Sequence, residues 1–270
     1  MSSSAVPEDL PGDLPATICD ALGVAKVEQV RLSRRGLVTY DLKVRDGWPV
    51  RTLKVAPPND PFAVLAEVDR LEWIDRRLPC PKVLASAQIE GGGHAVVLSL
   101  PPGTRASSAE HVTRASRTVE YLAQALRFVH EIPIENCPFS ARLELRLRSI
   151  KRRITIDQYD PSTFTPPYNR YPVTRLLEIL LDSRPGEDDD VFTHGSFGLD
   201  ATLLDQSGIS GVVDWGLAGV ADRYVDLAAA VRSIARVLGP EQIPDFFRWY
   251  GLEHPDPRKL DFYALLAEFE

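Results

Sequence analysis

The chain has 270 residues, of which 44% are hydrophobic and 26% are charged, and its formal net charge at pH 7 is −7. This composition is typical of a soluble globular protein, and the length allows two lobes with a shared cleft. The acidic balance argues against nucleic acid as a partner and is compatible with a polycationic ligand.

The sequence also limits where the protein works. It contains no run of about 18 apolar residues, so we expect no membrane partner. The N-terminal residues are polar, acidic and Pro-rich, which is not the pattern of a signal peptide. Cys19, Cys80 and Cys137 have no metal-ligand spacing. Together these features favour a cytoplasmic protein with reduced cysteines.

The first half of the chain predicts an antiparallel sheet. Apolar and polar residues alternate over several runs that are bounded by turn residues. The predicted strands are 27–33, 37–44, 49–56, 82–89 and 94–100. Lys54 lies near the end of the third strand, where a lysine is usually a solvated edge charge. The Pro-Pro-Gly that follows residue 100 predicts a boundary between two lobes.

One helix is predicted within this half, over residues 61–78. Leu65, Val68, Leu71 and Ile74 recur at helical spacing and form its apolar stripe. Glu67 is expected to lie off that stripe.

The second half of the chain predicts mostly helices. Residues 111–132 carry an apolar face and predict a core helix. Residues 139–153 predict a basic helix whose charges alternate with leucines, so a solvated face is a better interpretation than a nucleic-acid site. A Pro-rich loop follows over 154–171, a helix is predicted to begin near Ala221, and two more helices close the chain.

Residues 190–227 differ from the rest because polar residues interrupt short apolar runs. The runs are VFTHG, ATLLD and ISGVVD, and the last of them ends at Asp214 in Asp-Trp-Gly. Strand-like runs that end in polar loops are compatible with a phosphate or metal site.

This segment resembles the catalytic segment of the aminoglycoside 3'-phosphotransferases, which are small-molecule kinases with a protein-kinase-like fold. That family reads His-Gly-Asp, then Asn, then Ile-Asp-x-Gly, then Gly-x-Ala-Asp-Arg-Tyr-x-Asp. The matching residues here are His194, Gly195, Asp214, Gly216, Ala221, Asp222, Arg223 and Tyr224. The Cys-Pro-Phe at 137–139 also matches, and the resemblance extends from about residue 25 to 270.

The resemblance implies a bilobal α+β fold. Residues 1–100 are expected to form a nucleotide-binding lobe with an antiparallel sheet and one helix, and residues 101–270 a mostly helical catalytic and substrate lobe. The implied ligands are Mg²⁺, ATP or GTP, and a polycationic aminoglycoside.

The resemblance also implies which residues bind the nucleotide. Lys54 and Glu67 fit the kinase ion pair that positions a lysine against the phosphates, and Asp214 fits the magnesium ligand. The loop at Ser33 fits the hairpin that covers the phosphates, although it is equally compatible with an ordinary hairpin. The backbone at Ser99 and Leu100 fits the hinge that meets the purine.

On the acceptor side, the family uses acidic residues of a loop and of the C-terminal helix to bind the amines of the drug. The residues that this implies here are Asp157, Asp160, Arg232, Glu268 and Glu270.

Two positions depart from the family. Ser196 stands at the position of the base, and a serine cannot accept the acceptor hydroxyl's proton at neutral pH. Ala201 stands at the position of the metal-binding Asn and removes one ligand. Asp200 is an alternative ligand or base if the loop shifts, although a loop aspartate is usually a turn former. His194 is expected to brace the loop.

These departures lead to two functional hypotheses. The favoured one is a catalytically impaired, pseudokinase-like protein that binds nucleotide through Lys54, Glu67 and Asp214. The alternative is an active ATP- or GTP-dependent kinase that phosphorylates a hydroxyl of an aminoglycoside antibiotic and so confers resistance. A fold retained without nucleotide binding is a third possibility.

Overall fold

The computed structural model describes residues 10–23, 25–33, 36–44, 50–156, 159–186 and 189–269. The chain forms two compact units. Unit 1 comprises Met1–Thr104 and Leu203–Gly216, and unit 2 comprises Arg105–Thr202 and Leu217–Glu270. Residues 203–216 therefore return to the first unit after the chain has entered the second.

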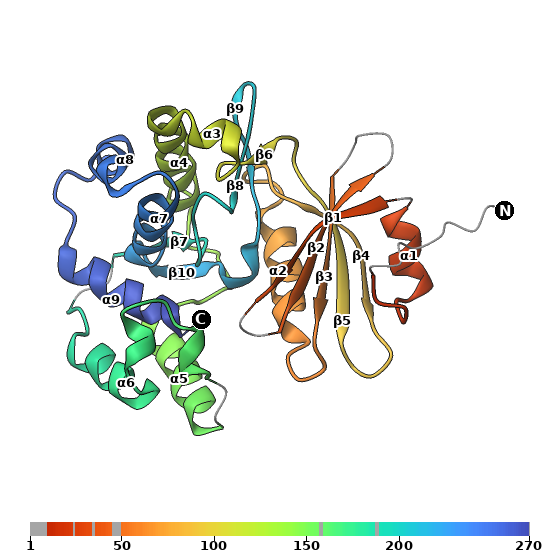
Figure 1. Ribbon diagram of the computed structural model, residues 1–270, viewed down its shortest axis with the longest axis horizontal. Coiled ribbons are helices and arrows are strands. Elements are labelled where there is room, and N and C mark those ends of the chain that lie inside the picture. The colour runs from red at the N-terminus through yellow and green to blue at the C-terminus, as the bar shows by residue number, and fades with distance from the viewer. Residues whose placement is uncertain are drawn as a thin grey trace. The chain divides into compact units, whose positions relative to one another are not determined.

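Unit 1 is built on a five-stranded antiparallel sheet with the strand order β1-β2-β3-β5-β4 (Figure 1). Its strands are β1 (Ala25–Leu32), β2 (Val38–Val44), β3 (Arg51–Ala56), β4 (Lys82–Gln88) and β5 (His94–Ser99). Each strand lies close to a run that the alternation of apolar and polar residues predicts, so this part of the predicted fold is confirmed. Residues 45–49, between the second and third predicted strands, lie outside the described residues.

A helix packs on each face of this sheet. Helix α1 (Ala16–Leu22) buries Ile18 and Leu22 in a cluster with Leu53 and Val97. Successive side chains of a strand point to opposite faces, so Lys54 points away from that cluster. Helix α2 (Phe62–Ile74) contacts β3 and β5, and it meets the face that carries Lys54.

The buried stripe of α2 differs from the predicted one. Val64, Glu67, Leu71 and Ile74 are buried, whereas Leu65 is only half-buried. The prediction that Glu67 lies off the stripe was wrong. The helix turns this carboxylate inward because Lys54, on the facing strand, supplies the charge that makes its burial tolerable.

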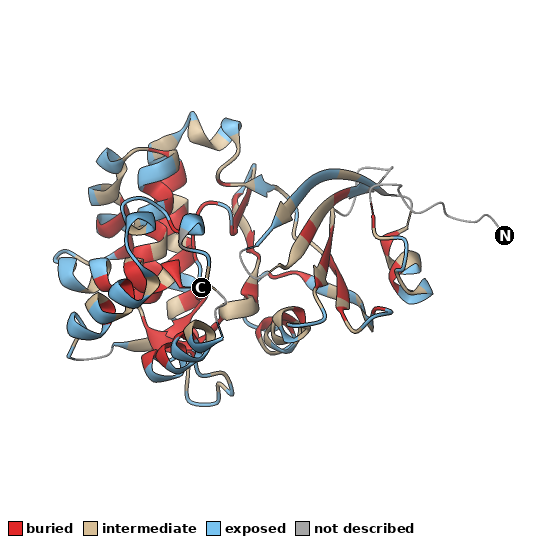
Figure 2. Ribbon diagram, turned by 60° about the horizontal axis from the view of Figure 1, so that its bottom comes forward, coloured by how far each residue is buried: buried red, intermediate tan, exposed pale blue. Residues whose placement is uncertain are grey.

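Unit 2 is mostly helical (Figure 1). Its helices are α3 (Ala109–Val112), α4 (Ala115–His130), α5 (Leu143–Thr155), α6 (Val173–Asp182), α7 (Tyr224–Val237), α8 (Ile243–Tyr250) and α9 (Pro257–Glu268). Helix α7 packs against α9, and α4 packs against α8. Most of these helices have buried residues on one side and exposed residues on the other (Figure 2). The predicted core face of α4 is buried at Val119, Leu122, Leu126 and Val129.

The chain also contains short strands and turns, of which β9 and most of β8 belong to unit 1. Strand β7 (Asp190–Thr193) pairs antiparallel with β10 (Gly219–Asp222), and β6 (Thr104–Arg105), β8 (Thr202–Asp205) and β9 (Gly208–Val212) form a three-stranded sheet. The 3-10 turns are η1 (Pro161–Thr163), η2 (Tyr168–Arg170), η3 (Trp215–Leu217) and η4 (Pro240–Gln242).

Helix α7 begins at Tyr224 and not near Ala221 as predicted. Residues 219–222 are held in a strand because they pair with β7. Asp222 then accepts a hydrogen bond from the Tyr224 backbone N–H at 2.8 Å, which satisfies the first N–H of the helix. None of the helices in the described part of the chain combines the length and apolarity needed to cross a bilayer.

Candidate functional site

The centre of the candidate site in unit 1 is a buried ion pair. The Lys54 ammonium donates to both carboxylate oxygens of Glu67, at 2.7 and 2.5 Å. The strand supplies the lysine and α2 supplies the glutamate, and only 5% of each side chain is exposed. The pair predicted from the sequence therefore forms.

Asp214 completes this arrangement from the loop that follows β9. Its Oδ1 accepts from the Lys54 ammonium at 2.8 Å, and 29% of its side chain is exposed. The backbone N–H of the next residue, Trp215, donates to Glu67 Oε1 at 3.2 Å. Glu67 thus holds both the lysine and the loop that carries Asp214.

The backbone at Asp214 is strained. Its φ is 69°, in the left-handed region that residues other than glycine seldom adopt. Such strain persists only where the surroundings enforce it, and it concentrates at functional sites. Here the enforcing contacts are those of Lys54 with the side chain and of Glu67 with the following N–H.

The Lys54 ammonium keeps its charge in this setting. Burial has the largest effect and by itself lowers the pKa of Lys54, but the charges and hydrogen bonds of Asp214 and Glu67 outweigh it and raise the pKa above its ordinary value. The site therefore presents a buried ammonium, charged at neutral pH, beside a partly exposed carboxylate.

Asp214 fits a magnesium ligand only together with a nucleotide. No group of three or more His, Cys, Asp or Glu side chains in the described residues could hold a metal ion. Mg²⁺ is commonly bound by one or two carboxylates and the phosphates of the substrate. One hard carboxylate that is partly exposed suits that mode and does not suit a cage made by the protein alone.

The other predicted nucleotide residues have structural contacts. The Ser33 hydroxyl accepts from the Leu37 backbone N–H at 3.0 Å and closes the β1–β2 hairpin. The Leu100 N–H donates to the carbonyl of Val50 at 3.0 Å, so this N–H is engaged within the sheet. Residues 34 and 35 of the loop lie outside the described residues.

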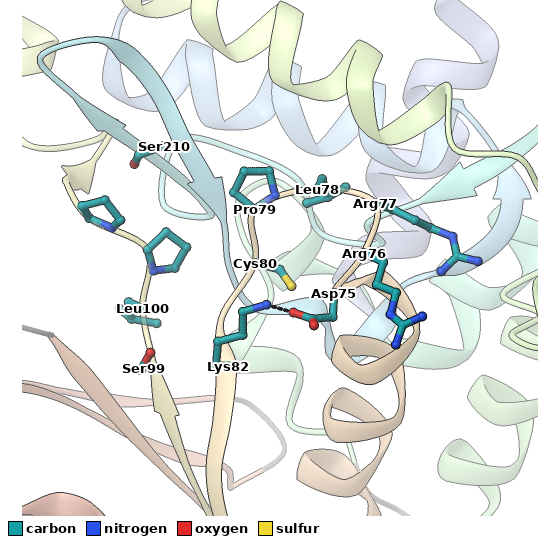
Figure 3. A pocket seen from close by; sticks show the side chains of 12 residues that line it. Asp75, Arg76, Arg77, Leu78, Pro79, Cys80, Lys82, Ser99, Leu100 and Ser210 are labelled. Carbon is teal, nitrogen blue, oxygen red and sulfur yellow. Dashed lines mark ion pairs between the residues drawn. The ribbon is translucent and has the colours of Figure 1, made fainter.

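A cavity of about 550 Å³ lies beside the predicted hinge (Figure 3). Ser99 and Leu100 line it together with the residues that follow α2, including Cys80. Burial raises the pKa of the Cys80 thiol to about 11. Lys54, Glu67 and Asp214 do not line this cavity, so it is distinct from the ion-pair site.

In unit 2, the loop after β7 is anchored by Asp226 of α7. The backbone N–H groups of His194 and Gly195 donate to its two carboxylate oxygens, at 2.6 and 2.8 Å. His130 Nε2 lies 3.1 Å from Oδ2. Burial, the largest effect, raises the pKa of Asp226, but His130 and His194 outweigh it and hold the pKa below its ordinary value. Sequence reasoning gave Asp226 no role.

This anchor fixes the residues that precede the base position. Gly195 has a φ of +94°, and a Cβ there would meet the Leu217 carbonyl oxygen at 2.5 Å, so only glycine fits. The Ser196 N–H donates to Nδ1 of the buried His194 ring at 3.3 Å. His194 therefore braces the loop, and Ser196 is exposed.

Asp200 is held by side chains of unit 2. Its Oδ1 accepts from Ser107 Oγ at 2.6 Å, its Oδ2 pairs with Arg236 at 3.2 Å, and its carbonyl oxygen accepts from Arg105. These contacts stabilise a turn, which agrees with the structural interpretation better than with a replacement base. Ala201 is buried, and its side chain carries no atom that can bind a metal.

Three of the predicted acceptor residues are described. Glu268 is buried, and it accepts from the Thr165 N–H and hydroxyl at 2.8 and 2.6 Å and from Arg232 Nη1 at 2.7 Å. The structure thus brings Arg232 and Glu268 together. Asp160 instead caps the turn at Ser162. Asp157 and Glu270 lie outside the described residues.

The Ala-Asp-Arg-Tyr motif is part of the scaffold. Asp222 pairs with Lys259 of α9 at 2.7 Å. Arg223 donates to Asp189 and to the hydroxyl of Tyr250. The motif therefore ties α7 to neighbouring segments of unit 2.

Comparisons with known proteins agree with this architecture. The model of the phosphotransferase enzyme family APH matches residues 38–263. The aminoglycoside 3'-phosphotransferase of Niallia circulans is 34% identical over 257 residues, which cover 94% of this chain and 97% of the relative. The aminoglycoside 3'-phosphotransferase of Streptomyces fradiae is 32% identical over 221 residues, which cover 79% of this chain and 82% of the relative.

Solved structures show the same relationship. The crystal structure of an aminoglycoside-3'-phosphotransferase of type VIII has a TM-score of 0.80 and 28% identity, covering 95% of this chain and 100% of that one. The aminoglycoside phosphotransferase APH(3'')-Id from Streptomyces rimosus has a TM-score of 0.76 and 25% identity, covering 89% and 92%. The chain therefore belongs to the aminoglycoside 3'-phosphotransferase family, whose members have a protein-kinase-like fold.

Proposed function

We propose that this protein is a kinase that transfers the terminal phosphoryl group of ATP or GTP to a hydroxyl of an aminoglycoside. The observation that carries the proposal is Lys54, which is held in its charged form between Glu67 and Asp214. This is the arrangement that phosphoryl transferases use to position nucleotide phosphates. Similarity to aminoglycoside 3'-phosphotransferases over nearly the whole chain supports the same activity.

In this reaction the acceptor oxygen attacks the γ-phosphorus as the bond to the leaving nucleoside diphosphate breaks. Lys54 would neutralise charge on the phosphates, and Asp214 would hold the Mg²⁺ that accompanies them. The metal supplies further charge neutralisation at the phosphate oxygens. The hydroxyl proton passes to phosphate or water, because Ser196 cannot accept it.

The substitution at Ser196 lowers the rate without preventing the reaction. A positioned base typically contributes about 10²–10⁴ in rate. The transition state of phosphoryl transfer is loose in most analyses, so positioning and electrostatic stabilisation supply most of the catalysis. We therefore expect slow turnover that depends on Lys54 and Asp214.

The acceptor is proposed to be a polycation. A net charge of −7 attracts such a ligand, and the structure of APH(3'')-Id from Streptomyces rimosus was determined in complex with ADP and streptomycin. In this chain the Glu268 carboxylate already binds Thr165 and Arg232. Its proposed contribution is therefore to hold the loop at 159–171, whose exposed acidic residue Asp160 faces solvent.

A second candidate is a nucleotide-binding protein that transfers no phosphate. The observation that favours it is the pair of substitutions, because Ser196 and Ala201 remove a base and a metal ligand together. Nothing in unit 1 distinguishes it from the kinase, because both candidates use Lys54, Glu67 and Asp214.

Phosphate transfer decides between the candidates. Labelled ATP and GTP are incubated with a panel of aminoglycosides and the protein, with the double variant Ser196→Asp/Ala201→Asn, and with Lys54→Met as a negative control. Slow transfer by the natural chain, faster transfer by the double variant and none by Lys54→Met support the kinase. Transfer by the double variant alone supports the binding protein. If neither transfers phosphate to any member of the panel, the proposed acceptor is wrong.

A further inference from the structure

The row of residues that crosses the sheet at Lys54 contains a second cation. The register pairs Lys54 of β3 with Thr39 of β2, and Thr39 with Arg31 of β1. Residues directly opposite each other on antiparallel strands point to the same face. Arg31 and Lys54 therefore project from one face of the sheet, with one strand between them.

Arg31 also reaches the same carboxylate as Lys54. Its Nη1 lies 3.6 Å from Asp214 Oδ2, whereas the Lys54 ammonium lies 2.8 Å from Oδ1. Its Nη2 donates to Asp41 Oδ1 at 3.1 Å. The two oxygens of Asp214 thus face two different cations, both from unit 1.

The guanidinium of Arg31 has a hydrogen-bond donor that no described residue accepts. Its Nε is buried and has no hydrogen-bond partner among the described residues. A buried donor without an acceptor is unfavourable and calls for an explanation, such as a ligand or ion that supplies the acceptor. The planar fork of an arginine matches the oxygens of a phosphate.

The balance of charges around Asp214 also supports a phosphate-binding role for this arginine. Glu67, Asp41 and Asp214 supply three carboxylates, against the two cations Lys54 and Arg31. Without Arg31 the cluster would hold three carboxylates and one ammonium, and its larger net negative charge would oppose the phosphates of a nucleotide. Since the side chain of Ala201 provides no metal ligand, neutralising the charge of the phosphates depends more on the cationic side chains of the protein.

We propose that Arg31 is a phosphate-binding residue of the nucleotide site and acts beside Lys54 on a nucleoside di- or triphosphate. The inference rests on the proposed function, because it requires that unit 1 binds a nucleotide. The role of Arg31 follows from the chemistry of phosphate recognition. It can be tested by nucleotide binding, without a measurement of kinase activity.

Calorimetric titration of the full-length protein tests this role. Mg·ATP, Mg·ADP and adenosine are titrated into the natural protein, Arg31→Gln and Lys26→Gln. Lys26 is an exposed cation of the same strand and provides a control with the same change of charge. Arg31→Gln should weaken ATP and ADP binding by about tenfold or more, as for the loss of a charge-assisted hydrogen bond, and leave adenosine binding unchanged. Lys26→Gln should change none of the three.

The outcomes separate this inference from the proposed function. If the natural protein binds none of the nucleotides, the proposed function fails and the inference fails with it. If it binds ATP and Arg31→Gln binds equally well, only the inference is wrong. An equal loss for ATP and adenosine assigns Arg31 a structural role and overturns the proposal. Thermal unfolding checks the fold of each variant, and Arg31→Lys, which keeps the charge and loses the fork, should show an intermediate loss if Arg31→Gln does not fold.

Discussion

Lys54 is a residue at which burial and charge oppose each other. A lone ammonium at this depth would lose its proton or destabilise the fold. Glu67 and Asp214 keep it charged, and Glu67 also binds the N–H of Trp215. A change at Glu67 therefore affects the lysine and the Asp214 loop together.

Glu67→Gln should lower the free energy of unfolding by about 3 kcal/mol, as expected when one member of a buried pair loses its charge. The amide accepts only one hydrogen bond from Lys54 and presents a donor where the second oxygen stood. Urea denaturation measures the loss. Glu72→Gln, at an exposed position of the same helix, should stay within about 0.5 kcal/mol of the natural protein. Equal effects of the two substitutions would contradict the structural role of Glu67.

At this scale the sequence predicted the Lys54–Glu67 pair and missed Arg31. A resemblance to a known family supplied the pair. Arg31 lies in a run with an alternating pattern, and alternation does not identify which face of a strand meets the site until the register with β2 and β3 is known. The register places Arg31 opposite Thr39 and so in the row of Lys54.

Among the structural elements, α7 organises the loop that contains the base position. Asp226 binds the N–H groups of His194 and Gly195, and His130 of α4 supports it from the other side. In the sequence, apolar residues dominate the pattern of the segment that forms α7. A single buried carboxylate in such a helix gives no periodic signal, although Asp226 is the last residue of the matched motif.

Asp226→Asn should destabilise the loop and change the response to acid. The pKa of Asp226 lies below its ordinary value of 3.8, so the unfolded chain binds this proton first as the pH falls. The stabilisation is therefore complete above about pH 5 and is lost as the pH falls through 3.8 toward the folded pKa. Denaturation between pH 7 and pH 3 should show a steeper loss of stability for the natural protein than for Asp226→Asn.

Amide hydrogen exchange locates this effect. In Asp226→Asn the N–H groups of His194 and Gly195 should exchange faster, because an amide oxygen replaces only one of the two carboxylate acceptors. Asp182→Asn, at an exposed position of α6, provides the control. If exchange at the loop is the same in all three proteins, Asp226 does not anchor it.

For the whole molecule, the predicted fold class is confirmed, and the roles predicted for the site residues remain predictions. Local pattern was sufficient for the five strands of unit 1 and the core face of α4. It could not predict that Asp200 binds Ser107 and Arg236, or that Glu268 binds Thr165, because these contacts join residues far apart in the sequence. Local pattern also could not predict that residues 203–216 return to unit 1, because this too depends on contacts between residues far apart in the sequence.

Nucleotide binding should stabilise the protein to an extent that depends on both Mg²⁺ and Lys54. A ligand at 100 times its Kd contributes about 2.7 kcal/mol to the folded state, which corresponds to a rise of about 5–10 °C in Tm for a chain of this size. Calorimetry is the suitable method for following thermal unfolding, because the chain has two units. A nucleotide held by unit 1 should shift the unfolding of that unit first. Chelation of Mg²⁺ should reduce the shift, since Asp214 offers the metal a single carboxylate and depends on the phosphates for the rest. Lys54→Met should abolish the shift, and an undiminished shift in that variant would place the nucleotide elsewhere on the protein.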